Sequence, residues 1–212
     1  KSLHMRSFQK LLFPIIVVVM ILPVASKSQV LINEYSASNL STVQDNYQEY
    51  EDWIELYNTG PATADIGGYY MSDDTASPML WMFPDGVTIP SHGFLRIWAS
   101  GRNEVSGGHY HAGFRLTQTK ADADWIVFSD PAGNILDQVQ LQITQANHSR
   151  GRTDDGIEEW SIFTVPTVGA SNGTSVPYLA YAEKPMVSDT GGFYSGALNI
   201  VITATEPNSV IR

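Results

Sequence analysis

The amino-acid sequence predicts an all-β protein of the sandwich or barrel type. Short runs rich in aromatic and β-branched residues recur along residues 30–141. Turn-forming Gly, Pro, Asn and Asp residues separate these runs, and no stretch shows a sustained helical period. Short strands at regular spacing, with such turns between them, are typical of β-sandwiches and β-barrels.

The run Trp53–Asn58 (WIELYN) has the alternation of a half-buried strand. Successive side chains of a strand point to opposite faces, which places Trp53 and Glu55 on one face and Ile54 and Leu56 on the other. We expect one face to pack in the core and the other to form a semi-polar outer surface.

Other runs have the composition of short strands. They are residues 30–36, 69–72, 94–99, 125–129 and 135–141. The sequence Asp-Pro-Ala-Gly-Asn at 130–134 connects the last two runs directly and predicts a β-hairpin, because these residue types favour tight turns. The five tryptophans lie in or beside predicted strands, and we expect most of them to be core residues.

A secretory signal peptide is expected at residues 5–28. Residues 1–4 precede the first Met and are expected to be an expression remnant. A basic start with Arg6 and Lys10 is followed by an apolar run at 11–24 and then by small and polar residues. The run is short for a membrane span, which needs about 20 residues, so an uncleaved anchor is the less favoured alternative. We expect an exported protein that is extracellular, bound to the cell surface or periplasmic, with no membrane span after cleavage.

The charge of the chain disfavours several partners. It carries 12 Lys and Arg against 22 Asp and Glu, a net charge of −10. Residues 1–28 hold 4 of the basic residues and no acidic one, so the remainder has 8 against 22, a net charge of −14. Such a surface repels nucleic acid and anionic lipid. The chain has no Cys, and its length is sufficient to bury a core without disulfides.

A series of short motifs follows one order along residues 30–172. They are Ile-Asn-Glu at 32–34, Asp-Trp-Ile-Glu-Leu-Tyr-Asn at 52–58, Gly-Tyr followed by Ser-Asp-Asp within 68–74, Trp-x-Phe-Pro at 81–84, Trp-Ala-Ser-Gly at 98–101, Ser-Asp-Pro-x-Gly at 129–133, Gly-Arg at 151–152, Trp at 160 and Pro-Thr-x-Gly-Ala at 166–170. The ordered set resembles the lamin-tail domains of exported bacterial proteins. The resemblance implies an immunoglobulin-like β-sandwich over residues 29–172.

The composition changes after residue 172. We expect residues 173–182 to be a linker. Residues 183–212 resemble the start of the small β-domain at the C-terminus of chitobiases and β-hexosaminidases, with a strand expected at 198–204. The resemblance implies a truncated domain whose apolar strand lacks its partner sheet. An unfinished sheet leaves an open edge that can pair with a neighbouring molecule.

Two clusters carry metal-ligand chemistry. His109 and His111 lie on one side of the chain if the segment is extended, a spacing that can bind a transition metal, but no third ligand accompanies them and a polar loop is favoured. Asp73 and Asp74 offer oxygen ligands for calcium, but their spacing fits no EF-hand loop and a side-chain-capped turn is favoured. The sequence therefore predicts no cofactor, with calcium as the alternative.

The candidate binding surface consists of tyrosines. Tyr47 and Tyr50 are interleaved with acidic residues in a long loop at 37–52. Aromatic side chains with a polar end are frequent at interfaces, and a solvated loop is the alternative. Tyr70 follows another Tyr in a predicted strand, so one of these two rings faces away from the core.

No catalytic motif is present. The sequence has no G-x-S-x-G, P-loop or H-E-x-x-H pattern. The acidic residues at 154–159 have the context of a turn, and we expect them to pair with Arg150 and Arg152 at the surface. We therefore expect no catalytic residue within residues 29–212.

Two function classes follow. The first is a non-catalytic interaction or scaffold module of a bacterial cell-surface or secreted multidomain protein. The second is an accessory region of a larger secreted enzyme, because the resembled domains occur joined to spore-coat-kinase-like (CotH) domains, hydrolases and nucleases. A protein or a glycan at the cell surface is the expected partner, and direct glycan binding is compatible with both classes.

Overall fold

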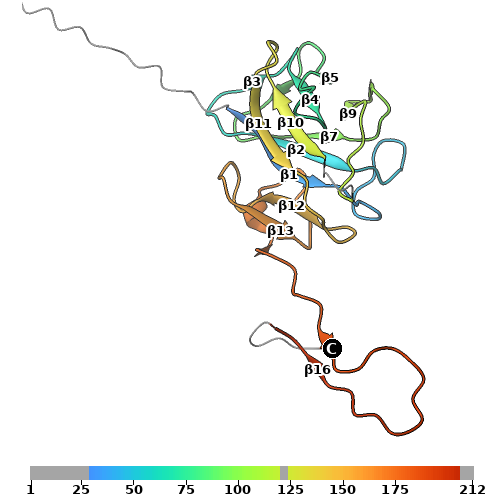
Figure 1. Cartoon of the computed structure of the whole chain (residues 1–212). Coiled ribbons are helices and arrows are strands. Elements are labelled where there is room, and N and C mark those ends of the chain that lie inside the picture. Colours follow the sequence, from blue (N-terminus) through green and yellow to red (C-terminus); the bar gives the residue numbers. More distant parts are fainter. Residues whose placement is uncertain (1–28, 120–123, 206–212) are drawn as a thin grey trace, which may run out of the picture.

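The computed structural model describes residues 29–119 and 124–205, and nearly all regular structure in them is β (Figure 1). One short 3₁₀ helix, Asn172–Thr174, interrupts the strands. The strands are β1 (Val30–Ser36), β2 (Trp53–Asn58), β3 (Ala64–Asp65), β4 (Tyr70–Ser72), β5 (Trp81–Met82), β6 (Thr88–Ile89), β7 (Phe94–Trp98), β8 (Glu104–Ser106), β9 (His109–His111), β10 (Trp125–Ser129), β11 (Ile135–Gln140), β12 (Ser149–Arg152), β13 (Trp160–Phe163), β14 (Pro177–Tyr178), β15 (Met186–Val187) and β16 (Ile202–Thr203).

Two sheets form the body of the molecule. The large sheet has eight strands in the order β14-β13-β12-β1-β2-β7-β9-β8, and the small sheet has four in the order β11-β10-β4-β5. Neighbouring strands pair antiparallel, except for β7 and β9, which pair parallel. In Figure 1, β10 and β11 cross over β1 and β2, as expected for two packed sheets. The predicted β-sandwich is confirmed.

The inner faces of the two sheets share one hydrophobic core. Ile32, Ile54 and Ile97 supply it from the large sheet, and Ile126 and Phe128 supply it from the small sheet. Three of the tryptophans are buried, as expected, and the two at positions 125 and 160 are half-buried. The expected alternation in β2 is also present, because the isoleucine and leucine of that strand belong to this core.

A β-bulge in β1 controls which side chains enter the core. The register of β1 against β2 shifts between Ile32 and Glu34, so that Ile32 and Tyr35 both belong to the core although they are three residues apart. A bulge inserts one extra residue and restores the alternation on its far side. Glu34 thereby pairs with Glu55 of β2 and with Gly151 of β12.

The expectation of a semi-polar outer surface on β2 is wrong. Trp53 and Glu55 lie on the face away from the core, yet both are fully buried. The segment between β13 and β14, residues 164–176 and hereafter the β13–β14 loop, covers this face near Glu55, to which the Gly169 backbone N–H donates a hydrogen bond. The large sheet is therefore buried on both faces in this region.

The predicted hairpin between β10 and β11 is confirmed. The backbone N–H of Asp130 donates to the carbonyl of Asn134 at 3.0 Å, and the Asp130 side chain accepts from the backbone N–H groups of Ala132 and Asn134. Gly133 has a φ of +82°, a left-handed conformation that glycine adopts without strain. The turn chemistry at 130–134 was therefore sufficient to predict this connection.

The expected linker contributes to the sandwich. β14 pairs with β13 at the edge of the large sheet, and the Tyr181 hydroxyl accepts a hydrogen bond from the backbone N–H of Gln145 at 3.0 Å. Beyond this point β15 pairs with β16, a strand shorter than the one expected at 198–204. Many apolar side chains of this part are exposed: Met186, Val187, Phe193, Tyr194, Leu198, Ile200, Val201 and Ile202.

The expected signal peptide and the last residues of the truncated domain lie outside the described residues. Within residues 29–119 and 124–205, no helix is both long and apolar enough to cross a membrane.

The core predicts a large cost for truncating Phe128. This ring is fully buried and packs against the rings of Tyr69 and Phe83, at centroid distances of 5.6 and 6.4 Å. Removing it leaves a cavity, so Phe128→Ala should lower the free energy of unfolding by about 3–5 kcal/mol in urea denaturation. The control Ile143→Ala removes a side chain that is 68% exposed and should change it by less than about 0.5 kcal/mol. Equal effects of the two substitutions would contradict this core.

Candidate functional site

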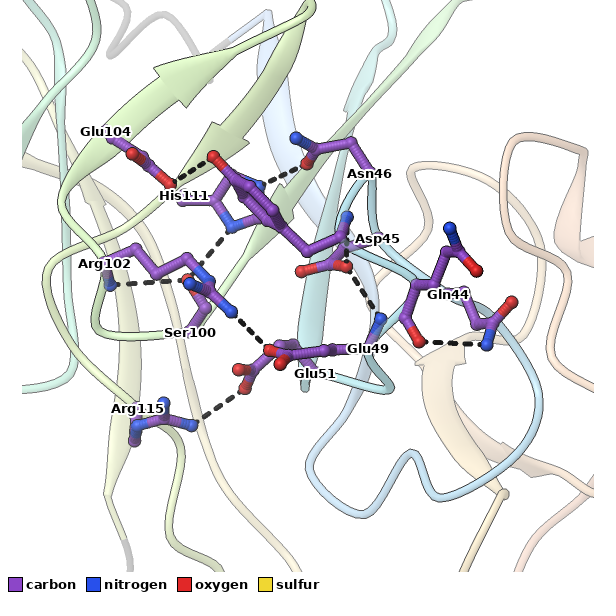
Figure 2. Close-up of polar contacts among 12 residues, drawn as sticks. Gln44, Asp45, Asn46, Glu49, Glu51, Ser100, Arg102, Glu104, His111 and Arg115 are labelled. Atoms are coloured by element: carbon purple, nitrogen blue, oxygen red, sulfur yellow. Dashed lines mark hydrogen bonds and ion pairs between the residues drawn. The ribbon is translucent and has the colours of Figure 1, made fainter.

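The segment between β1 and β2, residues 37–52 and hereafter the β1–β2 loop, packs on the edge of the large sheet that β8 and β9 form (Figure 2). A tight turn positions its aromatic and polar side chains. Asp45 accepts hydrogen bonds from the backbone N–H groups of Tyr47 and Glu49, and Gln48 has a positive φ of 64°. The Asp45 side chain, buried at the centre of this turn, fixes the loop where the sequence predicts a binding surface.

Tyr47 is held on three sides, although its side chain is 42% exposed. Its hydroxyl donates to Glu104 at 2.8 Å, the Arg102 guanidinium lies 4.5 Å from the ring centroid, and the His111 ring lies 5.6 Å away. Arg102 also forms an ion pair with Glu49 of the loop. These contacts make Tyr47 a clamp between the loop and the sheet, and they leave only part of its ring for a partner.

His111 is the buried centre of this contact. Its Nε2 lies 2.8 Å from Oδ1 of Asn46, and its Nδ1 lies 3.0 Å from Oγ of Ser100 (Figure 2). Because an amide oxygen only accepts, Nε2 carries the proton and Nδ1 accepts from the serine hydroxyl. The neutral imidazole satisfies both bonds, and burial lowers the pKa of His111 below its ordinary value.

This serine–imidazole–amide chain has the residue types of an activated nucleophile, but its geometry does not suit one. Ser100 is buried, so its hydroxyl is out of reach of a substrate. These hydrogen bonds join the β1–β2 loop to β9 and to the residues that follow β7. Their role is structural.

The two histidines lie on the same side of β9, as their spacing predicts. Both rings stack on Trp98, at centroid distances of 6.5 Å for His109 and 6.4 Å for His111. Nδ1 of His109 accepts from the Trp98 indole at 3.2 Å, and both nitrogens of His111 have hydrogen-bond partners. Since a metal ligand needs a free lone pair, this arrangement does not favour a metal ion between them. No group of three or more His, Asp or Glu in the described part of the chain is arranged to hold a metal.

Asp73 and Asp74 lie in a turn after β4. The Ser72 hydroxyl accepts from the Asp74 backbone N–H at 3.0 Å, and the Asp74 side chain accepts from the N–H of Ala76 at 2.8 Å. These are the bonds of a side-chain-capped turn, the interpretation that the sequence favours.

The three candidate tyrosines are not gathered on one surface. Tyr50 lies in the β1–β2 loop with Tyr47 and is 43% exposed. Tyr70 belongs to the small sheet, where it is half-buried between Met82 of β5 and Ser129 of β10. Tyr70 therefore lies in the small sheet, whereas Tyr47 packs against an edge of the large sheet.

Two buried carboxylates form a site that the sequence did not predict. Glu34 and Glu55 are cross-strand partners on the face covered by the β13–β14 loop. Glu34 accepts from the hydroxyls of Ser149 and Thr167 and from the Thr167 backbone N–H. The Gly169 N–H donates to one oxygen of Glu55 at 2.5 Å, while its other oxygen is buried without a partner in the described structure.

Burial raises the pKa of both carboxyl groups. The pKa of Glu55 reaches about 8; the Gly169 hydrogen bond opposes the rise, and the neighbouring Glu34 carboxylate adds to it. A protonated Glu55 is therefore the form that suits this environment at neutral pH. The sequence signal was the pair of Glu residues in adjacent strands, but the bulge that places them side by side was not predictable.

The expectation that Arg150 and Arg152 pair with the acidic residues at 154–159 is wrong for Arg152. Its guanidinium donates to Asp137 of β11 and to the Ile32 carbonyl, each at 2.8 Å. Asp155 instead accepts from the Asn33 side chain and the Asn172 backbone N–H. Both residues are thus internal links of the sandwich.

A groove opens where β11 of the small sheet approaches β12 and β13 of the large sheet. Its volume is about 280 Å³, and we call it the inter-sheet groove. The residues that line it are Trp125, Gln138, Val139, Gln140, Gln142, Arg150 and Trp160. It combines aromatic, amide and cationic groups in one concavity, a composition that suits a ligand.

Residues 23–142, more than half of the chain, match the family model of the lamin tail domain. This chain belongs to the lamin tail domain family. The family and the two packed sheets together establish an immunoglobulin-like β-sandwich. No curated protein matches the chain.

The family match ends shortly after β11, whereas the large sheet of this lamin tail domain continues through β12, β13 and β14. These later strands complete both sites described above. Ser149 and the β13–β14 loop bind Glu34, and Arg150 and Trp160 form one wall of the inter-sheet groove.

The raised pKa of Glu55 predicts a pH-dependent stability. Its folded pKa of about 8 exceeds the ordinary glutamate value of 4.5, so the native state favours the protonated group. The contribution of the protonated Glu55 to the free energy of unfolding is complete below about pH 4.5 and is lost as the pH rises through about 8. Glu55→Gln mimics the neutral form and should be more stable than the wild type at pH 9, by a few kcal/mol at about 1.4 kcal/mol per pKa unit.

The measurement is urea denaturation of both proteins from pH 5 to pH 9. The two should have similar free energies of unfolding at pH 5 and should diverge above it. Parallel pH profiles over the whole range would show that Glu55 does not titrate with a raised pKa.

Proposed function

We propose that this lamin tail domain is a non-catalytic recognition and scaffold module of an exported, multidomain protein of a bacterial cell surface. One observation carries the proposal: the groups closest to catalytic chemistry are committed to internal bonds. The Ser100–His111 pair is buried and joins a loop to the sheet, and the Glu34–Glu55 pair lies under the β13–β14 loop. What the described surface offers instead is a groove of aromatic and amide side chains.

Export is supported by the sequence of residues 5–28, which has the pattern of a signal peptide. The strongly acidic remainder suits a protein that does not bind nucleic acid. The proposed partner is a protein or a glycan at the cell surface, and the proposal includes no cofactor.

The second candidate is an accessory region of a larger secreted enzyme, such as a CotH-like kinase, a hydrolase or a nuclease. The exposed apolar side chains of residues 186–202 favour a further contact surface there, because soluble proteins rarely expose so many together. The resemblance of residues 183–212 to a chitobiase-type domain supports the same candidate. In both cases the sandwich binds and a different domain carries out any chemistry.

Residues 5–28 should direct export of a reporter. Bacterial alkaline phosphatase without its own leader needs disulfides and is therefore active only outside the reducing cytoplasm. A fusion to residues 5–28 should be active, and the variant with Val17→Asp and Val18→Asp should be inactive, because charges interrupt the apolar run. Activity that is absent in both fusions, or equal in both, would contradict the signal peptide.

Recognition without turnover is the test of the module itself. Residues 29–212 fused to a fluorescent protein should sediment with bacterial cell envelopes in a saturable manner, and incubation should release no soluble sugar or peptide. Fluorescent protein alone is the control. Failure to sediment with envelopes, or product release that requires the fusion, would overturn the proposed function.

A further inference from the structure

Two tryptophans line the inter-sheet groove, and one of them is held by buried neighbours. The Trp160 ring lies 5.8 Å from the ring of Tyr35 and 5.3 Å from the Arg152 guanidinium, and both neighbours are buried. Trp125 lines the groove from β10, and Val139 connects it to the core. Side chains held in this way lose little entropy when a ligand binds. Indole rings also offer flat apolar surfaces for the C–H faces of a ligand.

The polar groups of the groove are suited to hydroxyls. Gln138 and Gln140 are exposed on β11, Gln142 follows them, and each side-chain amide both donates and accepts hydrogen bonds. Arg150 adds several N–H donors from β12, and no ion pair joins it to an acidic side chain within residues 29–119 and 124–205. A ligand with many hydroxyls can use donors and acceptors of this kind together.

Size and charge narrow the ligand further. The volume of about 280 Å³ is just below the roughly 300–1,000 Å³ of pockets for drug-sized molecules, so it suits a single ring. The net charge of −14 outside residues 1–28 opposes the approach of a polyanion. The groove therefore suits a ligand with apolar ring faces, hydroxyl groups at its rim and no net charge. These are the properties of a neutral sugar.

We propose that the inter-sheet groove binds one pyranose unit of a neutral glycan, with Trp125 and Trp160 packing on the ring and with the glutamines and Arg150 hydrogen-bonding its hydroxyls. This inference rests on the proposed function and names its site and ligand. A peptide strand added to the free edge of β11 is the competing occupant, since an edge strand leaves backbone groups unpaired. The groove favours the sugar because residues of both sheets line it, whereas a peptide would pair with β11 alone.

The test uses residues 29–212 and calorimetric titration with neutral oligosaccharides: cello-, chito-, xylo-, manno- and laminari-oligosaccharides. At least one should bind and raise the melting temperature. Gln140→Ala should weaken that binding about fivefold, as expected for one lost hydrogen bond, and Trp125→Ala should weaken it about tenfold or more. An oligogalacturonate should bind at least about tenfold more weakly, because its charge is repelled.

A matched variant lies outside the groove. Gln44→Ala removes a glutamine of the β1–β2 loop and should bind the sugar like the wild type. Gln140 is exposed on an edge strand, so its variant keeps the test valid if Trp125→Ala fails to fold.

The outcomes separate this inference from the proposed function. If no neutral oligosaccharide binds, or if binding is unaffected by Gln140→Ala and folded Trp125→Ala, the sugar site is wrong. Envelope sedimentation that survives both groove variants and is lost after protease treatment of the envelopes would indicate a protein partner. That result would overturn the sugar site and leave the recognition module intact. Loss of both sedimentation and sugar binding in the groove variants would support the two proposals together.

Discussion

The carboxylate of Glu34 joins three parts of the chain that are far apart in sequence. It lies in β1 and accepts hydrogen bonds from Ser149 of β12 and from Thr167 of the β13–β14 loop. The β13–β14 loop then covers the outer face of β2 at Glu55, which is fully buried. A buried carboxyl group costs free energy unless it is hydrogen-bonded, so this cluster is the condition for burying the large sheet on both faces.

The same principle operates at the edge of the large sheet that β8 and β9 form. There the buried His111 is satisfied by Asn46 of the β1–β2 loop and by Ser100. In each case a long loop supplies the partner that a buried polar group on the sheet requires. Residue types that resemble catalytic groups in the sequence thus serve to fasten loops. This is the physical basis of the proposal that the domain is a non-catalytic recognition module.

The proposed recognition depends on surfaces that these fastened loops leave open. The inter-sheet groove differs from the two polar clusters, because Arg150 has no acidic partner there within the described residues and the three glutamines are exposed. Its walls come from strands on both sides of the sandwich, and Trp160 is positioned by buried neighbours. A groove that combines a fixed aromatic ring with exposed hydrogen-bonding groups is what a recognition module needs.

The sequence by itself determined the all-β class, the strands at 30–36, 53–58 and 125–129, and the hairpin at 130–134, because alternation and turn chemistry are local properties. It also placed His109 and His111 on one side of β9. Only the tertiary structure decided that the outer face of β2 is buried, that Glu34 lies beside Glu55, and that Trp125 and Trp160 share a groove. These depend on a bulge, a covering loop and the approach of two sheets, which are contacts between distant segments that no local pattern encodes.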